Sequence, residues 1–293
     1  MGDYIARAIA AGGYVRAFAC RTTDTVEEAR RLHNMSPVVT VAMGRLLSGG
    51  VMMGSMMKND QDRLTIRIQS QGPVEMMLVT ADAAGHVKGF AKNPQVIVPN
   101  KNGHLDVAGA VGLGVLSVIK DTGLREPYVG DTILVTSEIG DDLTNYFAES
   151  EQVPSSVGLG VRMKKDATVA EAGGFIVQLM PGATQELTLR LENRLRTMPQ
   201  ITESLAAGKT PEDILQEILA PEGLEILDRL PVSWYCGCSR ERMRSGLISL
   251  GKKELQEMIG DGKPIEVNCQ FCGKTYEFPL AELKEMEQEA VRK

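Results

Sequence analysis

The first 180 residues combine segments in which apolar and polar positions alternate with segments in which apolar positions recur at helical spacing. The stretch RLTIRIQS, residues 63–70, alternates along its length, which is the pattern of a half-buried β-strand. Further strand signals lie at residues 75–80, 127–136 and 174–179. Helical spacing is found at residues 25–33 and 36–57, where Ser36 is the expected N-cap and Pro37 the first helical residue. The mixture predicts an N-terminal α+β domain over residues 1–180.

Residues 181–231 show helical periodicity only. A first helix is predicted from four apolar residues on one face, and it is expected to end at Gly208. These apolar residues are Leu187, Leu191, Leu195 and Met198. Another short helix is predicted over residues 222–230, before Pro231. Because isolated helices of this length are marginal in water, they need a neighbouring surface for their apolar side chains. We therefore expect a helical linker that depends on its neighbours.

The segment TPEDILQEIL, residues 210–219, has the clearest helix signal of this linker. Thr210 is the expected N-cap, Pro211 occupies the first helical position, and Asp213 completes a capping box. The apolar stripe of this helix consists of Ile214, Leu215, Ile218 and Leu219. We expect the stripe to be covered in the resting protein.

The last segment, residues 232–293, holds four of the five cysteines of the chain. They form a CxC pair and a CxxC pair, which are Cys236 with Cys238 and Cys269 with Cys272. Apolar positions alternate before and after the second pair, so the sequence predicts a β-hairpin with that pair at its tip. A helix near residues 250–259 and a charged helix from Pro279 complete the predicted C-terminal domain.

Composition and charge narrow the function classes. The chain is 43% hydrophobic and 24% charged, which is typical of a folded globular protein. Its net charge of −6 gives no support to a general nucleic-acid or anionic-membrane binder. The apolar stretch at residues 37–57 contains Arg45 and a Ser-Gly-Gly break, so a buried helix is expected rather than a membrane span. The N-terminal residues have no signal-peptide pattern, so a cytoplasmic location is expected.

The four clustered cysteines predict a metal site. In a reducing cytosol, clustered cysteines are more often metal-binding or catalytic than permanently disulfide-bonded. Two close pairs of thiolates suit one tetrahedral zinc ion per chain in a closed, structural site. The metal could be a scaffold only, or the site could be a redox switch whose oxidation removes the ligands. Three arginines follow the first pair and could lower thiol pKa values or form a solvated face; they are Arg240, Arg242 and Arg244.

The spacing of these cysteines, together with three sequence motifs, resembles the heat shock protein 33 family of redox-regulated chaperones. The motifs are NYFAESEQVPS at residues 145–155, GGFIVQLMPG at 173–182 and CGCSRERM at 236–243. The resemblance implies a non-enzymatic, ATP-independent cytosolic holdase that is latent when reduced and zinc-bound. It further implies that oxidants join Cys236 to Cys238 and Cys269 to Cys272, with zinc release, linker unfolding, dimerisation and binding of unfolding client proteins. The stripe of residues 214–219 is then the candidate client-binding surface.

Two other function classes compete with this interpretation. A zinc-ribbon nucleic-acid-binding protein needs phosphate contacts, which ten Lys and Arg against ten Asp and Glu from Pro231 onward do not favour. A thiol–disulfide oxidoreductase needs its CxxC motif at the start of a helix rather than at a hairpin tip. Nucleotide binding is not expected, because AAGKT at residues 206–210 has Glu203 where a phosphate-binding loop requires glycine. Cys20 is expected to be a buried small hydrophobic residue outside the switch.

Overall fold

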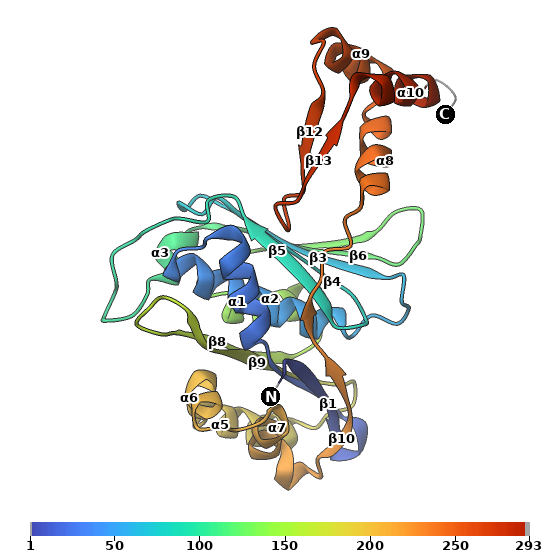
Figure 1. Ribbon diagram of the computed structural model, residues 1–293. Helices are drawn as coiled ribbons and strands as arrows, with labels where there is room; N and C mark the ends of the chain where they lie inside the picture. The colour runs from blue at the N-terminus through green and yellow to red at the C-terminus, as the bar shows by residue number, and fades with distance from the viewer. Residues whose placement is uncertain (1, 291–293) are drawn as a thin grey trace. The chain divides into compact units, whose positions relative to one another are not determined.

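The structure, a computed structural model, describes residues 2–290, which form two compact units. The first unit extends to Tyr235 and the second begins at Cys236. Figure 1 shows sheets flanked by helices in the first unit, and a hairpin with three helices in the second. The mixed α+β architecture predicted from the sequence is confirmed.

The first unit contains a five-stranded antiparallel sheet in the order β10-β1-β2-β9-β8. Its strands are β1 Tyr4–Ala10, β2 Val15–Arg21, β8 Ser155–Met163, β9 Val169–Leu179 and β10 Glu225–Pro231. A short 3-10 turn, η1 Ala11–Gly13, connects β1 to β2. The sheet therefore brings residues from the start and the end of this unit into neighbouring strands.

A second sheet in the same unit has the order β11-β5-β4-β3-β6-β7. Its strands are β3 Arg63–Ser70, β4 Met76–Ala81, β5 His86–Ala91, β6 Gly114–Asp121, β7 Tyr128–Ile133 and β11 Ser233–Trp234. The alternation read from residues 63–70 is confirmed, since the burial of β3 follows the same period of two. Among the strands that the structure describes, β11 alone pairs in parallel, with β5, and in the sequence it comes shortly before the second unit.

Helix α2, Pro37–Gly54, packs against strands of both sheets and forms the centre of the core. By length and composition it is the one described helix that could cross a membrane, but 89% of it is buried inside the protein. Pro37 starts the helix as predicted, whereas the Ser36 hydroxyl donates to the Val96 carbonyl oxygen instead of capping the helix. Three other helices complete this part: α1 Thr23–His33, α3 Val107–Val111 and α4 Gly140–Glu149.

The helices of residues 185–219 pack on the five-stranded sheet and belong to the first compact unit. They are α5 Gln185–Arg196, α6 Ile201–Ala206 and α7 Pro211–Leu219. The single helix predicted up to Gly208 is wrong, because the chain leaves helical structure before Pro199, whose ring excludes an interior helical position. The capping box of α7 is confirmed, since Thr210 and Asp213 exchange hydrogen bonds.

The helix predicted over residues 222–230 is also wrong. The segment contains the last residue of a 3-10 turn, η2 Ala220–Glu222, and then strand β10. Its apolar residues fit a helical period, but pairing with the edge of β1 gives hydrogen-bond partners to the backbone groups that face β1. Tertiary pairing therefore overrides the local pattern.

The second unit contains the predicted hairpin, formed by β12 Ile265–Asn268 and β13 Thr275–Phe278. Its helices are α8 Arg240–Leu250, α9 Lys252–Gly260 and α10 Leu280–Ala290. The helices expected near residue 250 and after Pro279 are confirmed as α9 and α10, whereas α8 was not predicted. The core of this unit is small, with Leu255, Phe278, Leu283 and Met286 fully buried at its centre.

Candidate metal centre

Two different local structures deliver the four cysteines. Cys236 and Cys238 lie in an irregular segment that leads into α8, whose N-cap Ser239 accepts a hydrogen bond from the Arg242 amide. Cys269 and Cys272 lie in the turn of the β12–β13 hairpin, as predicted. This turn needs Gly273, because its φ of 70° is one that residues with a side chain rarely adopt.

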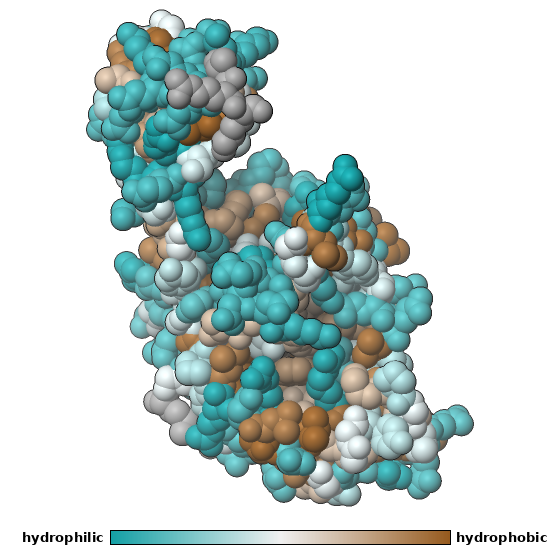
Figure 2. Space-filling view, turned by 90° about the vertical axis from the view of Figure 1, so that its right-hand side faces the viewer, coloured by the Kyte–Doolittle hydropathy of each residue, from teal (hydrophilic) through white to brown (hydrophobic). Residues whose placement is uncertain are grey.

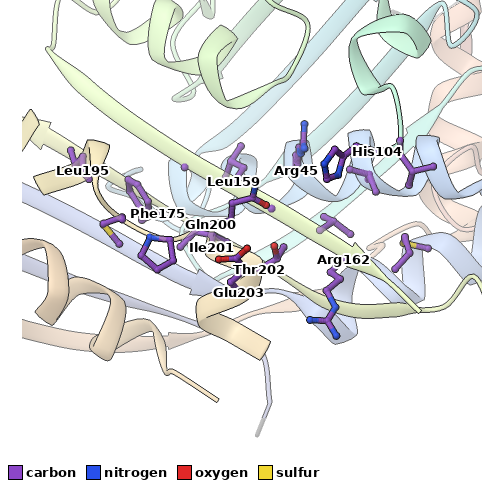
Figure 3. Close-up of a pocket in the computed structure, with 18 of the residues that line it drawn as sticks. Arg45, His104, Leu159, Arg162, Phe175, Leu195, Gln200, Ile201, Thr202 and Glu203 are labelled. Atoms are coloured by element: carbon purple, nitrogen blue, oxygen red, sulfur yellow. The ribbon is translucent and has the colours of Figure 1, made fainter. Parts of the chain in front are cut away.

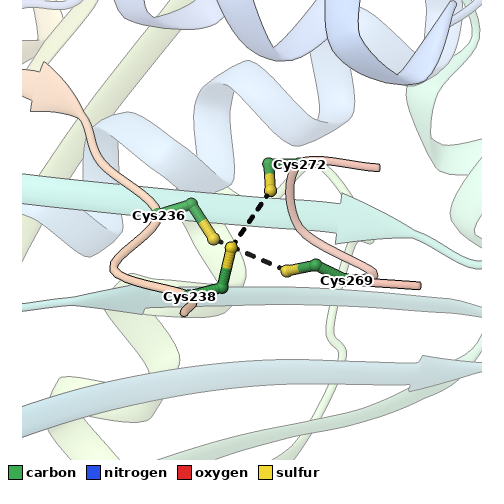
Figure 4. Close-up of side chains that lie close together, drawn as sticks. All are labelled: Cys236, Cys238, Cys269 and Cys272. Atoms are coloured by element: carbon green, nitrogen blue, oxygen red, sulfur yellow. Dashed lines mark hydrogen bonds between the residues drawn. The ribbon is translucent and has the colours of Figure 1, made fainter. Parts of the chain in front are cut away.

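The sulfur atoms of these four cysteines converge on one point, as Figure 4 shows. All four lie within 4.8 Å of one another, with Cys236 and Cys269 at 3.6 Å and Cys238 and Cys272 at 3.4 Å. These distances exceed a disulfide bond of about 2.05 Å, so the cysteines are free thiols. Zinc–sulfur bonds of about 2.3 Å in a tetrahedron separate the sulfurs by about 3.8 Å. The site therefore fits a small tetrahedral ion and could bind one.

The protonation of the thiols is uneven. Burial alone would raise the pKa of Cys238, but hydrogen bonds from the Tyr276 hydroxyl, at 3.2 Å, and from neighbouring thiols lower it to about 7. Burial, together with hydrogen bonds to the neighbouring sulfurs, raises the pKa of Cys236 to about 12. Cys238 is therefore the thiolate that the other groups stabilise. The sequence does not reveal this role of Tyr276, which there is only one of the alternating positions after the second cysteine pair.

The three arginines after the first pair stabilise the fold of the unit around the cysteines. Arg240 donates to the Glu277 carbonyl and to the Glu282 carboxylate, and its guanidinium lies over the Phe278 ring at 4.5 Å. Arg242 donates to the Gly237 carbonyl, between the two cysteines of the first pair. Arg244 pairs with a carboxylate of α10. These guanidinium groups thus donate their hydrogen bonds to carbonyl and carboxylate oxygens. The pKa of Cys238 is lowered instead by hydrogen bonds from Tyr276 and from the neighbouring thiols.

The fifth cysteine and the three histidines of the chain lie in the first unit. Cys20 is fully buried in β2 as predicted, and burial raises the pKa of its thiol far above the ordinary value. His33 lies edge-on to Trp234, and His86 stacks on Tyr235 with a ring distance of 4.6 Å. His104 and Arg45 line a cavity of about 740 Å³ beside β8, which Figure 3 shows. The histidines therefore occupy separate environments in the first unit.

The predicted client-binding stripe of α7 is covered in this structure. Its side chains are fully buried against β1 and β2, as expected for the resting protein; they are Ile214, Leu215, Ile218 and Leu219. The motif AAGKT connects the end of α6 to the N-cap of α7 and does not follow a strand as a phosphate-binding loop would. Its Lys209 pairs with Glu217, and its Thr210 caps α7.

Comparison with known proteins places this geometry in a family. The family model described as Hsp33 protein matches residues 3–279. A 33 kDa chaperonin of Lachnoclostridium phytofermentans is 56% identical over 287 residues, covering 98% of both chains. A 33 kDa chaperonin of Geobacillus kaustophilus is 47% identical over 290 residues, again covering 98% of both chains. The crystal structure of the 33 kDa chaperonin (Heat shock protein 33 homolog) from Thermotoga maritima superimposes with a TM-score of 0.89 at 34% identity, covering both chains completely. The chain belongs to the Hsp33 family of chaperones.

Proposed function

We propose that this protein is a redox-regulated holdase that binds unfolding proteins without ATP and without catalysing a reaction. In this proposal the reduced, zinc-bound protein is latent, and oxidation of the four cysteines activates it. One observation carries the proposal: the segment that covers the apolar face of the five-stranded sheet continues through β10 and β11 directly into Cys236. A chemical change at the cysteines therefore acts on the end of the covering segment.

The ligands in this proposal are the four sulfurs of Cys236, Cys238, Cys269 and Cys272. Zinc, when bound, would cross-link the start of the second unit to its hairpin and, with four thiolates around it, leave no open position for water. The unit has few buried apolar side chains, and cores of domains this small rarely contribute more than about 3–5 kcal/mol. Its fold therefore depends on the sulfurs remaining metal ligands.

Oxidation converts these ligands into disulfides. In each pair two thiolates lose two electrons to an oxidant such as hydrogen peroxide; a sulfur–sulfur bond forms, the oxygen–oxygen bond breaks, and two hydroxide ions leave. We propose the pairs Cys236 with Cys238 and Cys269 with Cys272. In the folded unit, sulfur contacts of 3.6 Å and 3.4 Å also join one pair to the other, as expected for four ligands around one point. Once the unit unfolds, however, sulfurs two or three residues apart have the highest effective concentration for each other.

Loss of the second unit then frees the covering segment. The α7 stripe stabilises the resting state, since each fully buried aliphatic side chain contributes about 1.5–3 kcal/mol. β10 has mostly exposed side chains, so it contributes little burial of its own. A strand of this kind opens at low cost when one end is released. We propose that the exposed face, including residues 214–219, binds clients, that the active form is a dimer, and that the protein works in the cytoplasm.

Metal content, free thiols and client aggregation, measured together before and after peroxide with mild heat, test this function. We expect about one zinc lost per chain, four thiols oxidised, and suppression of client aggregation to appear in parallel. Peptide mapping of the oxidised protein decides the disulfide pairs. A reduced, zinc-loaded protein that protects the client as well as the oxidised protein does would contradict the proposal.

A variant separates the metal site from general instability. We expect the double substitution Cys269→Ser and Cys272→Ser to abolish zinc retention, with Cys20→Ser as the control that removes a cysteine outside the cluster. If the double variant keeps its zinc and responds normally to oxidant, the assignment of the ligands is wrong.

A further inference from the structure

Strand β10 covers a sheet edge while contributing little to the core. It pairs antiparallel with β1 from Tyr4 opposite Pro231 to Ile9 opposite Glu225. Six of its seven side chains are exposed, whereas those of β1 are buried or partly buried. Its apolar residues Ile226 and Leu227 are 38% and 53% exposed, in a unit whose surface shows further apolar patches in Figure 2. What β10 supplies to the sheet is therefore mainly its backbone.

The outer edge of β10 is poorly suited to accept another strand. Pro231 has no amide hydrogen, the pairing is irregular opposite Arg7 and Ala8, and charged residues occupy much of the strand. Proline, irregular pairing and charge are common means of preventing edge-to-edge association. β1, in contrast, is the regular strand YIARAIA with a single charged residue. Removal of β10 would expose a continuous edge that lacks these protections.

The register shows which backbone groups would become free. The Val232 amide donates to the Asp3 carbonyl at 3.0 Å, and antiparallel pairing alternates from there. Ile5 and Arg7 therefore direct their backbone groups toward β10, opposite Leu230 and Asp228. On β10, the amide of Leu230 faces β1, and the amide of the next residue toward the N-terminus, Arg229, faces away.

Few contacts hold β10 in place beyond this backbone pairing. Arg7 and Asp228 form a two-fold ion pair at 2.6 Å, and Arg229 pairs with Glu212 on α7. The ion-pair residues on β10 are exposed, where such pairs contribute little. Glu212 also accepts a hydrogen bond from the Tyr4 hydroxyl at 2.7 Å, so it connects α7, β1 and β10. Release of α7 and release of β10 are thereby linked.

We propose that the β1 edge, once β10 has left, binds an extended segment of an unfolding client as an added antiparallel strand. The proposal rests on the redox-activated holdase function given above. β10 itself demonstrates the kind of partner that fits, since this edge accepts a strand whose side chains face mainly solvent. An edge that recognises backbone and tolerates varied side chains suits clients of unrelated sequence. Backbone pairing thus adds to the apolar contacts of the exposed face.

A labelled peptide with the sequence of residues 224–232 tests the pairing on the full-length protein by fluorescence anisotropy. We expect it to bind the oxidised protein at least tenfold more tightly than the reduced, zinc-loaded protein. Methylation of the Leu230 amide should weaken this binding at least tenfold, because that amide faces β1. Methylation of the Arg229 amide is the matched control and should change binding by less than twofold. Equal effects of the two methyl groups would overturn the proposal.

Competition and oligomeric state identify the occupant. Excess peptide should reduce suppression of client aggregation by the oxidised protein, and the peptide methylated at Leu230 should not. If the peptide binds but does not change the suppression of client aggregation, the proposal is overturned. The same holds if the peptide only converts an oxidised dimer to monomers, because β10 of a second copy would then occupy the β1 edge. If the oxidised protein suppresses aggregation but binds no peptide, strand addition is refuted and the holdase function is not. Oxidised protein that suppresses nothing refutes the holdase function.

Discussion

The contact between Gly85 and the end of β10 gives a sharp test of how the covering segment is held. Gly85 has a φ of 80°, and a Cβ built there lies 2.1 Å from the Pro231 carbonyl oxygen. The substitution Gly85→Ala therefore requires the chain at Pro231 to move. Gly103 has nearly the same φ, 79°, and no atom within 4 Å of a built Cβ. Gly103→Ala is thus a control with the same backbone strain and no steric contact.

The size of the effect follows from the hydrogen bonds next to Pro231. After Pro231, three backbone amides donate hydrogen bonds to carbonyl oxygens of the first unit. They run from Val232 to Asp3 at 3.0 Å, from Ser233 to Gly85 at 3.1 Å and from Tyr235 to Val87 at 3.0 Å. Both variants should lose about 1–2 kcal/mol of global stability from the left-handed alanine. If Gly85→Ala also breaks the two nearest bonds, at about 1 kcal/mol each, local opening becomes about 30-fold more frequent.

Hydrogen–deuterium exchange of the reduced, zinc-loaded proteins measures this opening. We expect amides 232–235 to exchange about 30-fold faster in Gly85→Ala than in Gly103→Ala, after correction for global stability. Suppression of client aggregation should then appear at lower oxidant doses in the first variant only. Equal exchange at these amides in the two variants would show that the contact does not hold the segment, and the reasoning about β10 release would be wrong.

Two further predictions concern α7 and its surroundings. Leu215→Ala should destabilise the docked helix by about 2–5 kcal/mol, because Leu215 is fully buried. Gln216→Ala, at an exposed position of the same helix, should be nearly neutral. Both variants are compared by thermal unfolding and by the oxidant dose at which client protection begins. Hydrogen bonds from arginine guanidinium groups hold the pKa values of Glu222 and Asp228 below their ordinary values of 4.5 and 3.8. These carboxylates therefore stabilise the covering segment above their unfolded pKa values, and that contribution is lost as the pH falls through the lowered folded values. Protection factors of α7 and β10 amides, which are exchange rates corrected for the intrinsic pH dependence of amide exchange, should stay constant from about pH 6 to 8 and fall below about pH 4. Protection factors that do not change in acid would contradict the role of these pairs.

The cysteine cluster is the part of the site that the sequence predicts best. The two cysteines of each pair are close in the sequence, so a CxC and a CxxC each hold two sulfurs near each other whatever the rest of the fold. A hairpin tip also brings the sulfurs of the second pair together. The Tyr276 hydroxyl could not be assigned in the same way, because its contact with Cys238 joins residues 38 positions apart. The arginines of α8 were likewise ambiguous, since their carboxylate partners on α10 are distant in the sequence.

The fold was predicted where the local pattern and the tertiary environment agree. β3 alternates in sequence and lies half-buried between two strands, and α7 has a capping box and one apolar face that packs on β1 and β2. The pattern was insufficient at Pro199, where α5 ends before the predicted apolar stripe does and Met198 lies in the break between α5 and α6. Spacing of leucines alone does not report whether the backbone between them remains helical.

The failure at β10 has a physical meaning for the proposed activation. Its sequence is compatible with a helix, and its side chains bury little, so its strand conformation depends on the edge of β1 rather than on its own preference. A segment whose local preference conflicts with its folded conformation is held only by tertiary partners, and it is released when those partners are lost. In a rigid structural protein such a conflict would only reduce stability. Directly before the cysteine cluster, in the activation proposed above, it would let a small chemical change uncover a large surface, because little intrinsic strand structure opposes the release.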